Sequence, residues 1–168
     1  MLSQQDIYKL FDARGIAYRR CEHVAVFTAE EALAADIPAW GVFAKNLFVC
    51  DNKKRDFKLI CAPLEKRVDL KAVADRLGCK RLRLAPADLL PRMLGVEQGS
   101  VTPLALFNDE AREVELVLDA QLADQVVGVH PLVNTATVYV AVADVMALLR
   151  ELGNGVRIVE CGPAEEER

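Results

Sequence analysis

The sequence predicts a single α+β domain, in which helices surround a mixed or largely antiparallel, barrel-like β-sheet. Helical and strand-like patterns both occur, and several strand-like runs follow one another through loops too short for a helical crossover. The 168 residues suit one domain, and their 52% of hydrophobic residues supply a large aliphatic core. We expect the domain to cover residues 1–163, followed by a frayed tail at 164–168.

The helices are predicted from capping residues and apolar spacing. They are expected at residues 3–14, 28–35, 69–77, 86–91 and 144–152. Ser3 and Asp6 form a near capping box, and Thr28 and Asp69 are residues that favour the N-cap position. Gly15 ends the first helix because glycine adopts the left-handed conformation easily.

The strands are predicted from short apolar or β-branched runs bounded by turn residues. They are expected at residues 16–21, 46–50, 57–61, 104–107, 114–118, 126–129, 135–140 and 156–160. The second and third strands form a hairpin with a charged turn, DNKKRD. Residues 95–103 are too rich in glycine and proline for a helix or a strand, so we expect a loop there.

Composition and motifs exclude several classes of protein. Charged residues interrupt the N-terminus where a secretory signal would be apolar, so we expect a soluble, cytoplasmic protein that binds no membrane. Five cysteines without a CxxC pair, and only two histidines, predict neither a disulfide framework nor a metal site. Glycine-rich nucleotide motifs and the GxSxG motif are absent, and no cofactor is expected.

The net charge of −4 is unevenly distributed along the chain. Residues 45–92 carry 13 Lys and Arg against 6 Asp and Glu, a net +7, whereas residues 93–168 carry a net −9. A basic middle segment suits contact with phosphates, and a solvated surface of mixed sign explains it equally well.

Three segments carry side chains suited to chemistry, and each has a simpler structural explanation. Lys45, followed by Asn46, can hold a phosphate or polarise a carbonyl, or only extend to solvent from a strand end. The loop Gly99–Pro103 can aim backbone N–H groups at a carbonyl oxygen, or serve only as a turn. His130 can donate or accept a proton, or be a structural histidine, which is how we interpret His23.

The three segments together resemble one protein family. Lys45-Asn46, the GxxxP loop at 99–103 and the stretch HPLVNTAT at 130–137 are similar in order and spacing to the free-standing relatives of the prolyl-tRNA synthetase insertion domain. These are trans-editing aminoacyl-tRNA deacylases, and the chain most resembles the branch that removes alanine from mischarged tRNA(Pro). The likeness spans residues 3–160. It implies the insertion-domain fold and metal-free hydrolysis of the Ala-tRNA(Pro) ester, with prolyl-tRNA synthetase as a candidate partner.

The resemblance also implies a role for each motif. Lys45 would help to hold the 3′ end of the tRNA beside Asn46, the loop of Gly99 would contact the ester, and His130 would position the substrate. The terminal adenosine's own hydroxyl would assist the attacking water. Besides these four catalytic residues, the expected substrate-binding residues are Phe27, Thr28, Ser100, Val101, Thr102, Pro103, Pro131 and Asn134.

Selection of alanine over proline requires exclusion by size, because a hydrophobic pocket cannot prefer the smaller side chain by affinity. The segment 28–40 is a candidate gate, with Phe27 and Trp40 as candidate walls and core packing as the alternative. The basic segment supplies candidate contacts to acceptor-stem phosphates, namely Lys53, Lys54, Arg55, Lys80 and Arg81, with Lys58 and Arg83 nearby.

Three alternatives stay open. The substrate could be Cys-, Ser- or Thr-charged tRNA, because related branches share the scaffold. The chain could be a binding module that lacks turnover, or a structural or regulatory partner of a synthetase.

Overall fold

The computed structural model describes residues 1–164, and the rest of the predicted tail, 165–168, lies outside the described residues. The helices are α1 (Gln4–Ala13), α2 (Ala29–Ala34), α3 (Leu70–Leu77) and α4 (Val142–Leu152), with short non-α helices η1 (Leu90–Leu94), η2 (Gln98–Ser100), η3 (Pro103–Asn108) and η4 (Ala120–Leu122). The strands are β1 (Tyr18–Glu22), β2 (Val42–Cys50), β3 (Lys58–Pro63), β4 (Arg83–Leu84), β5 (Glu115–Asp119), β6 (Val126–Val129), β7 (Ala136–Ala141) and β8 (Val156–Val159).

Local capping explains where the best-predicted helices begin and end. In α1, the Asp6 backbone N–H donates to Ser3 Oγ at 3.2 Å and Ser3 N–H donates to Asp6 Oδ2 at 2.8 Å, which completes a capping box. Asp69 Oδ1 accepts from the backbone N–H of Ala72 at the start of α3. Gly78 ends α3 with φ 68°, a left-handed conformation that favours glycine.

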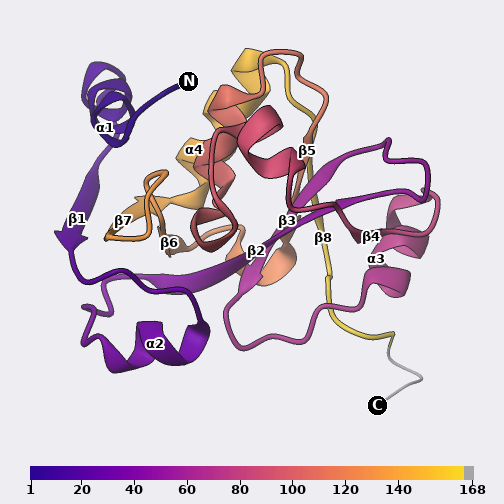
Figure 1. The fold of residues 1–168 in the computed structure, drawn as a ribbon, viewed down its shortest axis with the longest axis horizontal. Coiled ribbons are helices and arrows are strands. Elements are labelled where there is room, and N and C mark those ends of the chain that lie inside the picture. Colours follow the sequence, from indigo (N-terminus) through magenta and orange to yellow (C-terminus); the bar gives the residue numbers. More distant parts are fainter. Residues whose placement is uncertain (165–168) are drawn as a thin grey trace.

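The strands form one mixed sheet in the order β1-β7-β6-β2-β3-β5-β8, with β4 paired to β2 (Figure 1). The β2–β3 hairpin, β2–β4, β1–β7 and β6–β7 are antiparallel, whereas β2–β6, β3–β5 and β5–β8 are parallel. The predicted single α+β domain with a mixed sheet is therefore confirmed.

The sheet divides where β2 and β6 separate. These two strands pair at Val42 with Val127 and at Phe43 with Gly128, and their pairing stops there. From Ala44 onward β2 pairs instead with β3. If the β2–β6 register continued, Lys45 would face His130 across the two strands. Because the strands diverge first, both side chains border an opening in the sheet.

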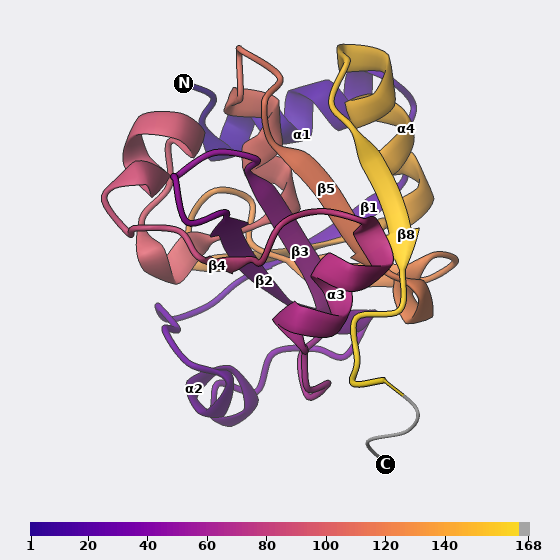
Figure 2. The same ribbon diagram turned by 90° about the vertical axis from the view of Figure 1, so that its right-hand side faces the viewer.

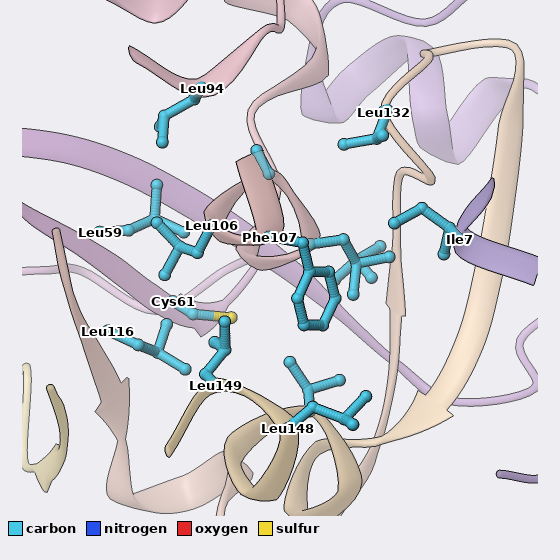
Figure 3. Close-up of a cluster of buried hydrophobic side chains, with 14 of the residues drawn as sticks. Ile7, Leu59, Cys61, Leu94, Leu106, Phe107, Leu116, Leu132, Leu148 and Leu149 are labelled. Carbon is cyan, nitrogen blue, oxygen red and sulfur yellow. The ribbon is translucent and has the colours of Figure 1, made fainter. Parts of the chain in front are cut away.

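Helices cover both faces of the sheet with apolar side chains. Side chains of α1, α4, η1 and η3 form the main core with β3 and β5, where Leu106 and Phe107 lie close to Leu148 and Leu149 (Figure 3). A smaller core joins α3 to the strands through Val73 and other buried residues, and α3 lies in front of them in Figure 2. The helix α2 lies apart from these cores, on the side of β2 where the sheet divides (Figure 1).

Two predicted elements are wrong, and others have shifted bounds; β2, for example, begins at Val42, four residues ahead of the strand predicted at 46–50. Residues 104–107, predicted as a strand, belong to the 3-10 helix η3. Thr102 caps this helix, and Pro103 lacks the backbone N–H that pairing with a neighbouring strand would use. All six residues of η3 are buried, and an apolar run buried on every side shows no period that separates helix from strand. The helix predicted at 86–91 is a turn followed by η1, and α4 begins at Val142, ahead of Asp144. None of the helices in residues 1–164 is long and apolar enough to cross a bilayer.

Candidate functional site

A cavity of about 210 Å³ lies at the opening between β2 and β6. Its walls come from the segment around α2, the start of β2, the loop before η3, and the ends of β6 and β7. The lining residues are Val26, Phe27, Thr28, Ala32, Ile37, Phe43, Ala44, Lys45, Asn46, Leu64, Gln98, Gly99, Val101, Gly128, Val129, His130 and Thr137. The cavity thus collects all four expected catalytic residues, and Phe27, Thr28 and Val101 among the expected substrate-binding ones.

Lys45 brings an unpaired positive charge to this cavity. Among residues 1–164 no carboxylate lies within ion-pair distance of its ammonium, and none of the described lining residues is acidic. A cation in a small, partly apolar cavity attracts a phosphate or a developing oxyanion more strongly than the same cation in open water.

Asn46, the next residue of β2, also lines the cavity. Its Oδ1 is buried and is the only buried side-chain nitrogen or oxygen of the described residues without a hydrogen-bond partner. A buried acceptor without a partner costs about 1–3 kcal/mol, and such groups concentrate where a protein has a function to perform.

Gly99 allows the Phe27 ring to approach the backbone closely. A Cβ atom at Gly99 would lie 2.9 Å from Phe27 Cδ1 and 3.4 Å from Asn134 Nδ2. Asn134 in turn donates from Nδ2 to the carbonyl of Val26 at 3.2 Å and accepts at its own carbonyl from the Val26 N–H. Asn134 therefore holds the chain that carries Phe27 against Gly99, although it does not line the cavity itself.

Thr28 fixes the start of α2 beside the cavity. Its Oγ1 accepts from the Glu31 N–H at 3.0 Å, and the Glu31 carboxylate accepts from the Phe27 N–H at 2.9 Å. This arrangement confirms the predicted cap and orients Phe27, whose side chain is 68% exposed.

His130 enters the cavity as a neutral acceptor. Its Nδ1 lies 3.1 Å from the Ala136 carbonyl, and because a carbonyl only accepts, Nδ1 carries the proton and Nε2 is left with a lone pair. Burial lowers the pKa of His130 below its ordinary value, and nearby His23 lowers it further, against the hydrogen bond to Ala136. The lowered pKa favours the neutral imidazole near pH 7.

Several predicted substrate-binding residues lie outside the cavity wall. Ser100, Thr102, Pro103 and Pro131 are buried behind it, and Thr102 uses its hydroxyl to cap η3. Trp40 packs edge-on against Tyr139, with ring centroids 5.3 Å apart, and Arg19 covers its face. Trp40 is therefore not among the lining residues, whereas Phe27 is.

The basic residues gather at the other end of β2. Lys53, Lys54 and Arg55 lie in the β2–β3 turn, and Lys80 and Arg81 precede β4, which pairs with Cys50 at the end of β2. Asp51 shapes this turn by accepting from the N–H groups of Lys53 and Arg55, and the Arg55 N–H holds the pKa of the Asp51 carboxyl below its ordinary value.

Lys58 lies next to the candidate phosphate contacts in the sequence, but its ammonium is directed into the protein. It is 3% exposed, and its ammonium donates to Asp56 at 2.9 Å and to Glu115 at 3.0 Å. Burial alone would lower the pKa of Lys58, but these two carboxylates raise it above its ordinary value. The charge is already neutralised inside the protein.

Two polar residues that could not be assigned to the site from the sequence, Thr137 and His23, also shape the cavity. Thr137 lines it, and its Oγ1 lies 2.9 Å from Nε2 of His23, which had been interpreted as structural only. Thr137 belongs to the stretch 130–137. The alternation of side chains along a strand cannot be extended from His130 to Thr137, because a loop separates them, so the sequence does not show that both face the cavity. The pairing of β1 with β7 brings His23 to it, and this pairing leaves no local signal in the sequence.

Comparison with known proteins identifies the family of the chain. Residues 23–148 match the family described as aminoacyl-tRNA editing domain. The chain is 35% identical over 161 residues to the prolyl-tRNA editing protein ProX of Acetoanaerobium sticklandii, covering 95% of this chain and 98% of that one. It is 42% identical over 133 residues to the prolyl-tRNA synthetase associated domain-containing protein 1 of Danio rerio, covering 77% of this chain and 72% of that one.

Solved structures share the fold. The crystal structure of hypothetical protein APE2540 matches with a TM-score of 0.69 at 24% identity, over 92% of this chain and 97% of that one. A structure described as a candidate trans-editing enzyme for prolyl tRNA synthetase matches with a TM-score of 0.70 at 19% identity, over 98% of this chain and 100% of that one. By sequence and by fold, the chain belongs to the aminoacyl-tRNA editing domain family.

Proposed function

We propose that the protein is an aminoacyl-tRNA deacylase that hydrolyses the ester of mischarged Ala-tRNA(Pro) in trans, with residues 1–163 as its editing domain. The observation that carries this proposal is the cavity of about 210 Å³ at the divided sheet, with Lys45 and His130 at its opening. Its volume is below the usual range for drug-sized ligands, roughly 300–1,000 Å³, and suits one small aminoacyl group. The name of the ProX relative supports prolyl-tRNA as the tRNA class.

The geometry supports a division of roles in hydrolysis. Water attacks the ester carbonyl carbon, the tetrahedral intermediate collapses, and the ribose oxygen leaves with a proton to give alanine and free tRNA. Lys45 holds the 3′-terminal phosphate and stabilises negative charge that develops near it, while Asn46 lies beside it. Neutral His130 positions the substrate, and the loop at Gly99 contacts the ester. A hydroxyl of the terminal ribose assists the water.

Discrimination against proline follows from the rigid parts of the wall. Hydrogen bonds of Asn134 to Val26 and of Glu31 to the Phe27 N–H fix the backbone that carries Phe27 beside Gly99, so the chain on this side of the cavity resists displacement. A second sieve of this kind accepts the smaller group and excludes the larger cognate one.

The basic end of β2 is the proposed contact for the tRNA body. From Lys45 the strand β2 runs five residues to Cys50, about 17 Å of extended chain, before the turn at Lys53 begins. That span exceeds one nucleotide, so the turn would meet acceptor-stem phosphates while Lys45 meets the 3′ end. Prolyl-tRNA synthetase is a candidate partner that could deliver the mischarged tRNA.

The proposal is tested by deacylation of tRNA(Pro) carrying Ala, Pro, Cys, Ser or Thr, each compared with its spontaneous hydrolysis. We expect rapid loss of alanine and retention of proline. Faster loss of Cys, Ser or Thr would assign the scaffold to another mischarged amino acid. Survival of all five esters would contradict the proposed deacylase activity and favour a binding module or a synthetase partner.

A further inference from the structure

We propose that Thr137, held by His23, is a fixed hydrogen-bond acceptor for the α-amino group of the aminoacyl ester. This inference rests on the proposed function and adds a recognition element to it. Size exclusion selects the side chain of the amino acid, whereas Thr137 and His23 would recognise its α-amino group. Thr137 would touch the substrate, and His23 would be a positioning residue that acts through Thr137.

The direction of the hydrogen bonds follows from the chemistry of the partners. Nδ1 of His23 lies 2.7 Å from the Val24 carbonyl, which only accepts, so Nδ1 carries the imidazole proton. In the neutral ring Nε2 is then an acceptor. The Thr137 hydroxyl, 2.9 Å from Nε2, must donate its proton to it. Thr137 Oγ1 is left with its lone pairs as an acceptor.

Strand geometry turns this acceptor toward the cavity. Side chains alternate along β7, so Val138 points into the main core while Thr137 and Tyr139 point to the opposite face. Thr137 lines the cavity there and is only 4% exposed. His130 shows the same polarity, because its Nδ1 donates to Ala136 and its Nε2 is a free acceptor.

One wall of the cavity therefore offers two acceptors, Thr137 Oγ1 and His130 Nε2. The first is oriented by His23, which is itself bonded to the Val24 carbonyl, and the second is oriented by the bond of His130 Nδ1 to the Ala136 carbonyl. No carboxylate among the described lining residues competes for a donor. A group with two or three N–H donors matches this wall, and the α-amino group of an aminoacyl ester is such a group. An α-hydroxy ester offers one donor, and a simple acyl ester offers none.

The test uses tRNA(Pro) carrying alanyl, lactyl or propionyl esters at pH 7, where ordinary imidazoles are mostly neutral and an α-amino group is mostly charged. Each enzymatic rate is divided by the spontaneous hydrolysis rate of the same ester. We expect wild-type protein to prefer alanyl over propionyl ester by about 10- to 100-fold, the range of one hydrogen bond to a charged group. The Thr137→Val variant keeps the shape of the side chain and removes the oxygen, and it should abolish most of this preference.

Three further variants separate recognition from folding. Thr137→Ser retains the hydroxyl and should keep the alanyl preference within about threefold of wild type. His23→Phe keeps a ring but frees the Thr137 proton to point into the cavity, so alanyl hydrolysis should fall while propionyl hydrolysis does not. His23→Gln restores an acceptor and should recover part of the alanyl rate.

The outcomes are distinguishable from failure of the proposed function. If wild-type protein leaves Ala-tRNA(Pro) intact, the proposed function itself fails. If wild type cleaves it but Thr137→Val lowers alanyl and propionyl rates equally, the residue is only structural and the inference is overturned. Equal wild-type rates on alanyl and propionyl esters would also overturn it.

Discussion

Replacing Gly99 by alanine should impair catalysis without unfolding the protein. The new Cβ would lie 2.9 Å from Phe27 Cδ1, whereas ordinary contacts of this kind are 3.4–4 Å, so the ring must move by roughly half an ångström or more. Phe27 is 68% exposed, so it can tilt outward at small cost. Gly99 is not among the glycines with positive φ, and alanine there gains about 0.4–1 kcal/mol by restricting the unfolded chain.

We therefore expect Gly99→Ala to change the free energy of unfolding by less than about 1 kcal/mol, or roughly 2–4 °C in Tm. Because the displaced ring is a wall of the cavity, deacylation of Ala-tRNA(Pro) should fall by about 100-fold, the scale of a 1 Å misplacement of substrate. Initial rates and thermal unfolding measure the two effects separately.

The double variant Gly99→Ala/Phe27→Ala identifies the cause. With the ring removed there is nothing for the new methyl group to displace, so the alanine at 99 should add little to the defect of Phe27→Ala alone. If Gly99→Ala lowered the deacylation rate as much in the Phe27→Ala background as in the wild type, displacement of the ring would not be the cause. A large fall in Tm for Gly99→Ala would likewise contradict this prediction.

Three further predictions follow from the charged and titrating groups. Asp119 is fully buried and accepts from Lys66 Nζ at 2.9 Å and from the Cys161 N–H at 2.8 Å. Asp119→Ala should therefore lower the free energy of unfolding, measured in urea, by about 3–5 kcal/mol, whereas Asp124→Ala at an exposed site should change it by less than about 0.5 kcal/mol. Equal effects of the two substitutions would contradict this prediction. The lowered pKa of His130 means that the unfolded chain binds a proton that the folded chain resists, so stability should decline as pH falls below about 6.5, and His130→Asn should flatten that decline in pH-dependent unfolding. Arg55→Gln should reduce the slope of log K against log salt for tRNA(Pro) binding by about one, whereas Lys9→Gln on α1 should leave the slope unchanged; a salt-independent wild-type affinity would rule out phosphate contacts.

Local signals predicted the elements whose ends are set by their own residues. The capping box of Ser3 and Asp6 and the left-handed Gly78 locate α1 and α3 because each effect operates within one turn. The fully buried run of η3 was misread as a strand, since tertiary burial removes the alternation that distinguishes the two. Resemblance to a family identified Lys45 and His130 as residues of one site.

The arrangement of the site depends on pairings between distant segments. Lys45 and His130 line the same cavity because parallel β2 and β6 separate just before them, and the sequence contains no mark of where that pairing stops. His23 reaches Thr137 only through the β1–β7 ladder, so its role could not be inferred from its neighbours in sequence. The neutralisation of Lys58 by Glu115 likewise follows from parallel pairing of β3 with β5.

The most direct test of the account is single-turnover hydrolysis of Ala-tRNA(Pro) by the wild-type protein and by Lys45→Ala, with Lys71→Ala on the exposed side of α3 as the matched control. Removal of an electrostatic contact to the reacting ester should lower the rate constant by about 100- to 1,000-fold, while Lys71→Ala retains the wild-type rate. Hydrolysis by Lys45→Ala at the wild-type rate would contradict the assignment of the site to the divided sheet.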